Sequence, residues 1–389
     1  MFWFSQQKPQ DEPVTGLVLP GGGARNAYQV GVLRAISEML PEDVDNPFPV
    51  ITGTSSGAVN AAVLATMAKD YHEAVIQLEL VWANLNVGNI FYAGPLTALK
   101  SGLRWLLTLI TAGGFGFITP RSVLDNKPLR KLLEKRLHLD RIQKAIDDGD
   151  LRAIGISASS YQSGHSICYY QGTDEITPWK RSQRYGLYRE LRVDHLMAST
   201  AIPLIFPAVK INGEYHGDGT MRESAPLSPA LHLGANRLLI IGVQDSADDE
   251  TGHEYPSVGQ ISGYVLDTLF MDSLNADIER MNRINLTIAK TKENRVEVDD
   301  TTLRPIEFLV ISPSVDLKDL VEKHVKSAPA SVRSLLRGMG ALNREGRPLI
   351  SYLLFESGFC QELIELGYRD GLKNRDEILK LLCIEQAED

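Results

Sequence analysis

A short pattern at residues 53–57, G-x-S-x-G, could carry the chemistry of a nucleophilic serine. It follows the apolar run Val50–Thr52 and precedes a small-residue segment, Ala58–Ala68, that predicts a helix. Between a strand and a helix, this pattern is typical of a sharp turn that exposes the serine hydroxyl, and the helix N-terminus favours developing negative charge. The pattern also arises by chance in many chains. Its setting predicts Ser55 as a nucleophile, with Ser56 facing the helix side.

Three consecutive glycines, Gly21, Gly22 and Gly23, follow another apolar run, Gly16–Leu19, and precede a helical pattern. Glycines at such a turn let backbone N–H groups point into a concave site at the helix N-terminus, where negative charge is favoured. The loop can be interpreted as an oxyanion hole, as a phosphate cradle or as a tight turn. A dinucleotide-binding fingerprint would place a third glycine at Asn26, and a P-loop would continue with Gly-Lys-Ser/Thr, so these two motifs are disfavoured.

An aspartate between two glycines, Asp218, offers a base for the serine. Flanking glycines allow unusual backbone angles and a close approach, although Asp-Gly is also an ordinary turn sequence. The aspartate follows a hairpin predicted at Asn212-Gly213, because both turn residues accept positive φ. The segment before the hairpin, residues 198–207, is rich in small residues and contains two prolines. These neighbours favour a role for Asp218 beyond the turn.

None of the eight histidines stands in a setting that marks a catalytic base. The chain order of an α/β-hydrolase would place an acid and then a histidine after the serine. Only His232, His253 and His324 follow Asp218, and His253 lies in an acidic stretch. The residues therefore favour a serine–aspartate pair over a triad.

In order and approximate spacing, these motifs and the segment at 201–207 resemble the patatin-like phospholipase family. The resemblance spans roughly residues 14–314. It implies that Ser55 is the nucleophile, that Asp218 is the catalytic aspartate, and that the glycines form the oxyanion hole (Gly21, Gly22 and Gly23). Two positions depart from the family pattern: Asn26 replaces the glycine that usually ends the first loop, and Thr220 replaces the glycine or alanine usual after Asp-Gly. The first departure bears on the oxyanion hole, whereas the second leaves the carboxylate intact.

The resemblance implies a serine acyl-ester hydrolase that releases fatty acid from phospholipid or lysophospholipid. Ser55 would attack the ester carbonyl, and Asp218 would take the serine proton and later activate water. Arg25 would offset the charge of the loop or contact a substrate phosphate, or else lie as a solvated surface side chain. Two other functions stay open: an acyltransferase using the same serine, and a nucleotide-binding module in which the glycine loop binds phosphate. No cofactor or metal is expected, since no clustered His, Cys and carboxylate spacing occurs.

Composition limits the class of protein. The chain has 389 residues and a formal charge of −9, with 43% hydrophobic and 23% charged residues, which is ordinary globular usage. An acidic chain is a poor general nucleic-acid binder, and three scattered cysteines are too few for a disulfide framework or a zinc site. No signal peptide or apolar run of about 18 residues occurs. The sequence thus favours a reduced, cytoplasmic setting, with peripheral contact to a membrane as the alternative, and it specifies no oligomeric state.

Short apolar runs alternate with helical patterns along the chain, at Gly16–Leu19, Val50–Thr52, Leu151–Ser157, Leu238–Val243 and Phe308–Ile311. This alternation predicts an α/β fold, a three-layer sandwich with a largely parallel central sheet. We expect a tail at residues 1–13, a catalytic domain at 14–314 and a helical C-terminal appendage at 315–389. The last helix is expected to begin at an Asn374 cap.

Residues 100–145 form a basic segment in an acidic chain, with ten basic and three acidic residues and hence a net charge of +7. The segment also contains the apolar run Trp105–Ile110 and two phenylalanines, Phe115 and Phe117. Basic residues mixed with aromatic residues and leucines are typical of a membrane-surface or lid element. A solvated helix whose apolar face packs on the sheet explains the pattern equally well.

Overall fold

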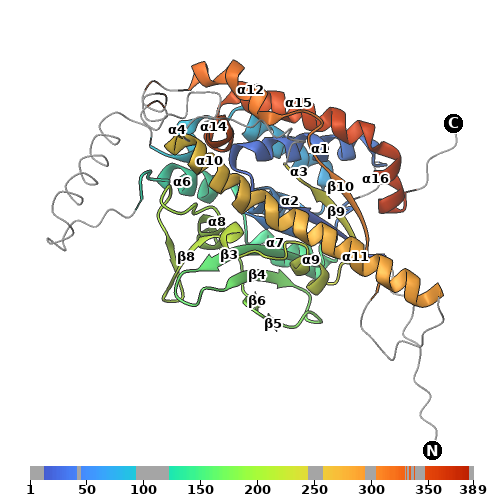
Figure 1. Cartoon of the computed structure of the whole chain (residues 1–389). Helices are drawn as coiled ribbons and strands as arrows, with labels where there is room; N and C mark the ends of the chain where they lie inside the picture. Colours follow the sequence, from blue (N-terminus) through green and yellow to red (C-terminus); the bar gives the residue numbers. More distant parts are fainter. Residues whose placement is uncertain are drawn as a thin grey trace, which may run out of the picture.

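A ten-stranded sheet forms the centre of the molecule (Figure 1). The structure is a computed structural model that describes residues 13–41, 45–92, 122–243, 257–293, 304–328 and 347–384, together with the single positions 330, 333 and 337. The strands lie in the order β10 (Glu307–Ile311), β9 (Arg237–Ile241), β1 (Thr15–Leu19), β2 (Val50–Thr54), β3 (Ala153–Ser160), β4 (Ser166–Gly172), β6 (Arg184–Tyr188) and β5 (Trp179–Arg181). A hairpin of β7 (Val209–Ile211) and β8 (Glu214–Asp218) joins the sheet where β8 pairs with β3.

The sheet has a parallel part and an antiparallel extension. Neighbouring strands from β10 through β9, β1 and β2 to β3 all pair in parallel, at the five runs predicted as strands. β4 and β8 both run antiparallel to β3, and β5 runs antiparallel to β6. The predicted α/β fold with a largely parallel central sheet is therefore confirmed, and the extension β4–β6–β5 is an addition that the sequence did not indicate.

Both faces of the parallel strands β9, β1, β2 and β3 are buried, which explains their continuous apolar sequences. Alternate residues point to opposite faces: Leu17 and Leu19 of β1 belong to one apolar core, and Val18 belongs to the other. The first core lies under α1 (Ala27–Met39), α2 (Ser56–Thr66) and α3 (Tyr71–Ala83), and the second lies under α9 (Ser228–His232) and α11 (Ser273–Glu293). The sheet thus forms the middle of three layers.

Further helices flank the sheet, and several of them lie together at one end of the molecule in Figure 1. A long helix consists of α10 (Val258–Asp267), a π-helical turn at Thr268–Asp272 and then α11. The other helices are α4 (Val87–Ile90), α6 (Lys127–Arg136), α7 (Arg141–Asp148), α8 (Val193–Ser199), α10 (Val258–Asp267), α12 (Leu317–His324), α14 (Arg347–Leu353), α15 (Ser357–Lys373) and α16 (Arg375–Leu382). Three 3₁₀ turns lie at Gly23–Asn26, Gly219–Met221 and Val325–Ser327.

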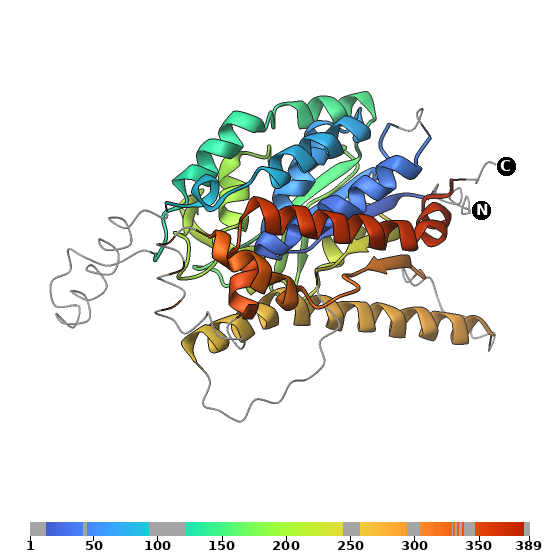
Figure 2. The ribbon, with the colours of Figure 1, turned by 90° about the horizontal axis from the view of Figure 1, so that it is seen from above.

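The C-terminal helices are built into the main core. Helix α15 packs along α1, and the two run side by side in Figure 2. Their backbones approach so closely that a Cβ at Gly31 would lie 1.9 Å from the Ile364 carbonyl oxygen. The Tyr28 hydroxyl also donates to Asp370 Oδ2 over 3.1 Å, in a buried position. The described part of 315–389 therefore packs on α1 as part of the main core, and after residue 314 the described chain is helical.

Two local predictions can be compared with the structure. The hairpin turn is confirmed, because Asn212 and Gly213 have φ of 49° and 92°. The last helix begins after Asn374, but the predicted side-chain cap is wrong. Asn374 Nδ2 instead donates to the Asp370 carbonyl oxygen over 2.8 Å. The side-chain amide therefore binds the C-terminal end of the preceding helix, α15.

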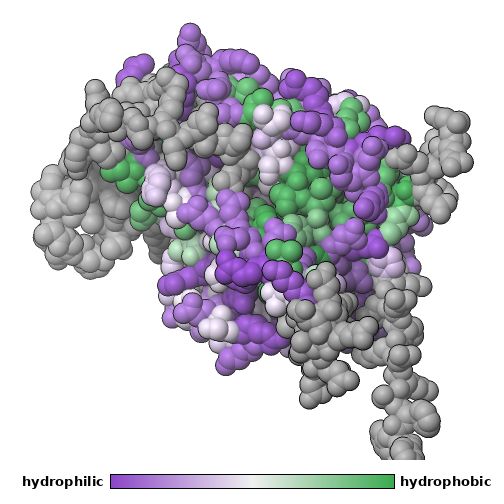
Figure 3. Space-filling model, turned by 45° about the vertical axis from the view of Figure 1, so that its right-hand side comes forward, coloured by the Kyte–Doolittle hydropathy of each residue, from purple (hydrophilic) through white to green (hydrophobic). Residues whose placement is uncertain are grey.

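Some predicted features lie outside the described residues, namely the tail at 1–12, the run Trp105–Ile110, Phe115, Phe117 and His253. In the part that is described, no helix combines the length and the apolar character needed to span a bilayer. The edge strand β10 keeps Phe308, Leu309 and Val310 half-buried. Hydrophobic surface framed by hydrophilic residues is visible on the side of the molecule that Figure 3 brings forward.

Candidate active site

Ser55 stands at a strained turn between β2 and α2. Its φ of 54° and ψ of −130° are unusual for a residue with a side chain. The turn brings the start of α2 against the end of β1, where a Cβ at Gly57 would lie 2.1 Å from the Leu19 carbonyl oxygen. The G-x-S-x-G pattern therefore folds into the predicted sharp strand–turn–helix.

The turn places Ser55 deep in the protein, with 2% of the residue exposed. Its backbone N–H donates to the Ser199 hydroxyl of α8 over 2.9 Å. Ser55 lines a pocket, and Ser56 lines the same pocket. Ser56 is the first residue of α2, so it borders the pocket from the helix that follows the turn.

Asp218 is the last residue of β8, and its pairing with Ala158 of β3 brings it to the turn that carries Ser55. Its Oδ1 accepts hydrogen bonds from the N–H and the hydroxyl of Thr220, over 3.1 and 2.8 Å. Among the described residues, no donor forms a hydrogen bond of regular distance and angle with the other carboxylate oxygen, Asp218 Oδ2. The threonine that departs from the family pattern thus adds a donor to the carboxylate.

Burial raises the pKa of Asp218 to about 6, although the side chains of Ser55 and Thr220 favour its ionised form. A carboxylate whose pKa is raised toward neutrality is a better base than a solvated one. The structure therefore brings together the serine and the aspartate that the sequence singled out.

The glycine loop lies beside this pair, and Gly23 lines the same pocket as Ser55. Gly23 has a φ of +56°, and a Cβ there would lie 2.2 Å from the Tyr352 carbonyl oxygen, so the position requires glycine. Within the described residues, the N–H groups of Gly21, Gly22 and Gly23 make no hydrogen bond. Of the three glycines, Gly23 borders the pocket that Ser55 lines, and the role of Gly21, Gly22 and Gly23 as an oxyanion hole stays a prediction.

Asn26 holds this loop in place. Its Nδ2 donates to the Pro20 carbonyl oxygen over 2.9 Å, and Gln29 Nε2 donates to the same oxygen over 3.1 Å. Both side chains are fully buried. Because the Pro20 carbonyl and the Gly21 N–H belong to one planar peptide, fixing the oxygen also fixes the direction of that N–H. Asn26, the first of the two departures from the family pattern, therefore constrains the loop.

Arg25 points away from the pocket into the protein, with 1% of its side chain exposed. Its Nε donates to Ser351 Oγ over 2.8 Å, its Nη1 lies 3.4 Å from Asp267 Oδ1, and its guanidinium carbon lies 4.0 Å from the centre of the Tyr352 ring. The alternative of a solvated surface arginine is therefore wrong. Contact with a substrate phosphate stays a prediction, while the observed contacts join the glycine loop to α10 and α14.

The histidine nearest to the aspartate in sequence, His216, belongs to a separate buried contact. Its Nε2 lies 2.9 Å from the Tyr169 hydroxyl, and its Nδ1 lies 3.2 Å from the Glu214 carbonyl oxygen. Burial lowers its pKa. No histidine of the described residues hydrogen-bonds to Ser55 or Asp218. None of the described histidines is therefore placed as a base for Ser55.

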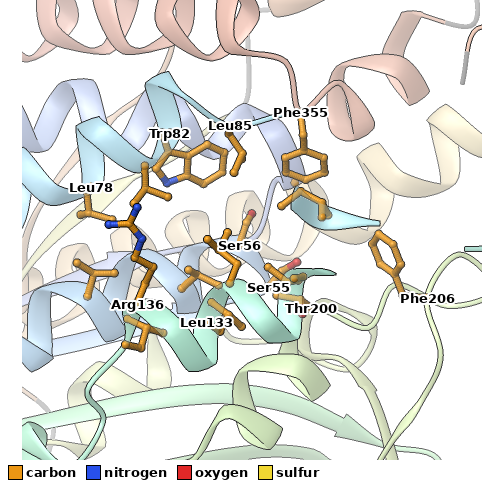
Figure 4. A pocket seen from close by; sticks show the side chains of 18 of the residues that line it. Ser55, Ser56, Leu78, Trp82, Leu85, Leu133, Arg136, Thr200, Phe206 and Phe355 are labelled. Carbon is orange, nitrogen blue, oxygen red and sulfur yellow. The ribbon is translucent and has the colours of Figure 1, made fainter. Parts of the chain in front are cut away.

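Figure 4 shows Ser55 and Ser56 at the floor of an apolar pocket of about 800 Å³, its open mouth included. Helices α2, α3 and α6 provide most of the wall, and Phe355 from the C-terminal region closes one side. In Figure 4 the guanidinium of Arg136 lies near Leu78, at the opposite end from Phe206. The apolar lining consists of Val59, Val63, Leu78, Val81, Trp82, Leu85, Ile90, Leu129, Leu132, Leu133, Leu137, Ile202, Phe206 and Phe355.

Helix α6 is the described part of the basic segment that borders this pocket. It buries Leu129 and Leu133 against the pocket and exposes Lys131 and Lys135 to solvent. Its apolar face therefore covers the site, whereas the alternative had this face packing on the sheet. Arg136 is exposed like Lys131 and Lys135, and it also lines the pocket.

A buried hydrogen-bond chain links the pocket wall to the glycine loop. Trp82 Nε1 donates to Asn60 Oδ1 over 2.8 Å, and Asn60 Nδ2 donates to Gln29 Oε1 over 3.0 Å. Gln29 in turn donates to Pro20. No sequence pattern indicates these residues, because they come from three different helices that only the tertiary fold brings together.

Comparison with known proteins agrees with this geometry. A family model described as patatin-like phospholipase matches residues 17–231, more than half of the chain. The chain therefore belongs to the patatin-like phospholipase family, a family of lipid acyl hydrolases.

Individual relatives match more narrowly. Lysophospholipase nte1 of Aspergillus terreus is 50% identical over 50 residues, which are 13% of this chain and 3% of that protein. VipD from Legionella pneumophila is 12% identical with a TM-score of 0.38, over 94% of this chain and 67% of that structure. Human GIVD cytosolic phospholipase A2, solved with a fluorophosphonate inhibitor, is 12% identical with a TM-score of 0.43. The match covers 98% of this chain and 60% of that structure. The chain thus spans only 3% of the length of its curated relative.

Proposed function

We propose that the chain is a serine acyl-ester hydrolase that releases fatty acid from phospholipid or lysophospholipid. One observation carries the proposal: Ser55 stands at a strained turn on the floor of an apolar pocket, next to the buried carboxylate of Asp218. An exposed turn serine without a pocket would be a structural residue. A serine at the base of a long apolar pocket is placed to receive an acyl chain.

In the proposed mechanism, Asp218 takes the hydroxyl proton as Ser55 Oγ attacks the ester carbonyl. The N–H groups of Gly21, Gly22 and Gly23 stabilise the oxyanion. The tetrahedral intermediate then expels the alcohol, which receives the proton from Asp218, and an acyl-enzyme ester remains on Ser55. Water attacks this ester, Asp218 takes its proton, and the fatty acid leaves as the proton returns to Ser55.

The substrate class follows from the pocket and the relatives. Apart from Arg136, the pocket residues beyond the two serines, Gly23 and Thr200 are apolar, which suits an acyl chain. A nucleotide-binding role for the glycine loop would require polar space for phosphate and sugar, which this lining does not offer. The matching stretch of a lysophospholipase favours a lysophospholipid or phospholipid ester. Acyl transfer would use the same acyl-enzyme with another acceptor.

The proposal is tested by measuring fatty-acid release from a defined panel of phospholipids and lysophospholipids. Ser55→Ala should reduce hydrolysis to background, because it removes the attacking oxygen and little volume. Ser56→Ala is the matched control, since it removes a neighbouring hydroxyl from the same pocket and should retain most activity. Hydrolysis by a folded Ser55→Ala variant would refute the proposal. Repeating the assay with added alcohol or thiol acceptors separates hydrolase from acyltransferase by the products formed.

A further inference from the structure

A second carboxylate, Glu223, is buried close to the proposed catalytic pair. It lies five residues after Asp218, and 6% of the residue is exposed. Burying an acidic side chain is unfavourable unless it is paired or hydrogen-bonded. No ion pair to Glu223 is formed within the described ranges of the chain. Its partners are therefore what must be explained.

Both carboxylate oxygens of Glu223 accept hydrogen bonds from hydroxyls at the carboxyl ends of neighbouring strands. Oε2 accepts from Thr54 Oγ1 over 2.7 Å, and Oε1 accepts from Ser157 Oγ over 2.5 Å. Thr54 and Ser157 are register partners on the parallel strands β2 and β3. Thr54 also directly precedes Ser55, so Glu223 holds the residue on which the strained turn begins.

Thr54 and Ser157 also contact the turn Gly219–Met221 that follows Asp218, here called the aspartate loop. A Cβ at Gly219, the residue after Asp218, would lie 2.5 Å from the Ser157 carbonyl oxygen and 2.7 Å from Thr54 Cγ2. The two residues that bind Glu223 therefore also pack against the backbone that carries Asp218. A single side chain thus connects the serine turn, β3 and the aspartate loop.

Joining two strands does not by itself require a negative charge. Each hydroxyl can donate or accept, so a glutamine could bond to both without the cost of burying an ionised group. The groups around Glu223 do not compensate its charge either. Those that interact with it are the acids Asp218 and Asp277 and the thiol of Cys168, while Arg184 and Tyr185 of β6 border the small cavity next to it. Above its pKa, Glu223 therefore adds a negative charge near Asp218 that no neighbouring contact requires.

We propose that Glu223 is a positioning residue for the reaction at Ser55, fixing the serine turn against the aspartate loop and placing a negative charge beside Asp218. This inference rests on the proposed function, because it assigns Glu223 to the same Ser55–Asp218 site. A negative charge near a carboxylate favours the protonated form of that carboxylate. Ionised Glu223 therefore makes Asp218 more basic toward the serine proton.

The pH dependence follows from burial. Burial raises the pKa of Glu223 to about 7, and the pKa of Asp218 is raised to about 6. The two carboxyls interact and titrate as a pair. If full activity needs both in the ionised form, the acid limb of the wild-type profile contains two protonation steps, one near each value.

The test is the pH profile of kcat and kcat/KM for Glu223→Gln on a short, soluble ester. We expect kcat to fall about tenfold with KM within about twofold, and the acid limb to lose its upper step so that one proton remains. Thr54→Val is the matched control, because it removes a hydroxyl of similar shape and keeps the charge. It should lower kcat while both protonation steps stay, and adding it to Glu223→Gln should cause little further loss.

A wild-type profile and wild-type kcat in Glu223→Gln would overturn the inference. Failure of the proposed function is recognised separately, because Ser55→Ala would then hydrolyse the ester and the wild type would not react with a serine-directed phosphonate. If Glu223→Gln does not fold, as judged by circular dichroism, Ser157→Ala and Thr54→Val decide. Unchanged kcat in both variants would then refute the positioning role.

Discussion

Ser55 separates two regions of opposite character. On one side, α2, α3 and α6 present apolar side chains and build a pocket that suits a long chain. On the other side, β2, β3 and β8 bring together buried polar groups, with Asp218 and Glu223 held by hydroxyls of Thr220, Thr54 and Ser157. The apolar side should therefore decide which acyl group binds, and the polar side should decide how fast the serine reacts. Each prediction below changes one side and asks whether the other is affected.

The largest effect is expected from Asp218→Asn. This change keeps the shape of the side chain but removes the base, so kcat should fall by about 10²–10⁴-fold and approach the level of Ser55→Ala. KM for a soluble ester should change little, because the apolar side is intact. The double variant with Ser55→Ala should be no slower than Ser55→Ala alone. Steady-state kinetics of a folded Asp218→Asn variant with near-normal kcat would remove Asp218 from the mechanism.

On the apolar side, Leu133→Trp should change selectivity for chain length. Leu133 of α6 is buried on the pocket wall, and a larger ring there shortens the available space. We expect kcat/KM to fall about 10- to 100-fold for long acyl esters and to change little for acetyl or butyryl esters. Lys131→Trp places the same ring on the exposed side of α6 and is the matched control. An equal loss on short and long esters would contradict the division between the two sides.

A smaller effect, on the polar side only, is expected from Thr220→Val. The threonine hydroxyl donates to Asp218 Oδ1 and so stabilises the ionised carboxylate, which lowers its pKa relative to burial alone. Removing this donor should raise the pKa above about 6. Because the ionised form is the base, the acid limb of kcat/KM should move to higher pH by about 0.5–1 unit, with activity at pH 8 nearly unchanged. A shift to lower pH would contradict the assigned contact.

The two sides also differ in how far the sequence predicts them. Ser55, Asp218 and the glycine loop can be singled out as candidates from sequence because tight turns and close backbone approaches leave local glycine patterns. The five parallel strands were found because burial on both faces leaves apolar runs. Glu223, Asn60 and Trp82 left no such pattern, because each acts through partners far away in the sequence. The direction of α6 likewise depends on which core its leucines face, and periodicity alone does not specify that.

Substitutions on the exposed face of α6 should have the smallest effect on catalysis. They should instead change binding to membranes. Lys131 and Lys135 are exposed there, and they lie on the outer side of the helix that covers the pocket. If this face contacts membranes, Lys131→Gln with Lys135→Gln should weaken binding to anionic vesicles, by about 1 kcal/mol for each charge removed at low salt. Hydrolysis of a short, soluble ester should be unchanged, because neither side of the active site is altered. Arg136 is left in place, since it lines the pocket. Vesicle sedimentation at two salt concentrations measures the effect. Equal binding of wild type and variant would show that these lysines are solvated surface residues with no role in membrane binding.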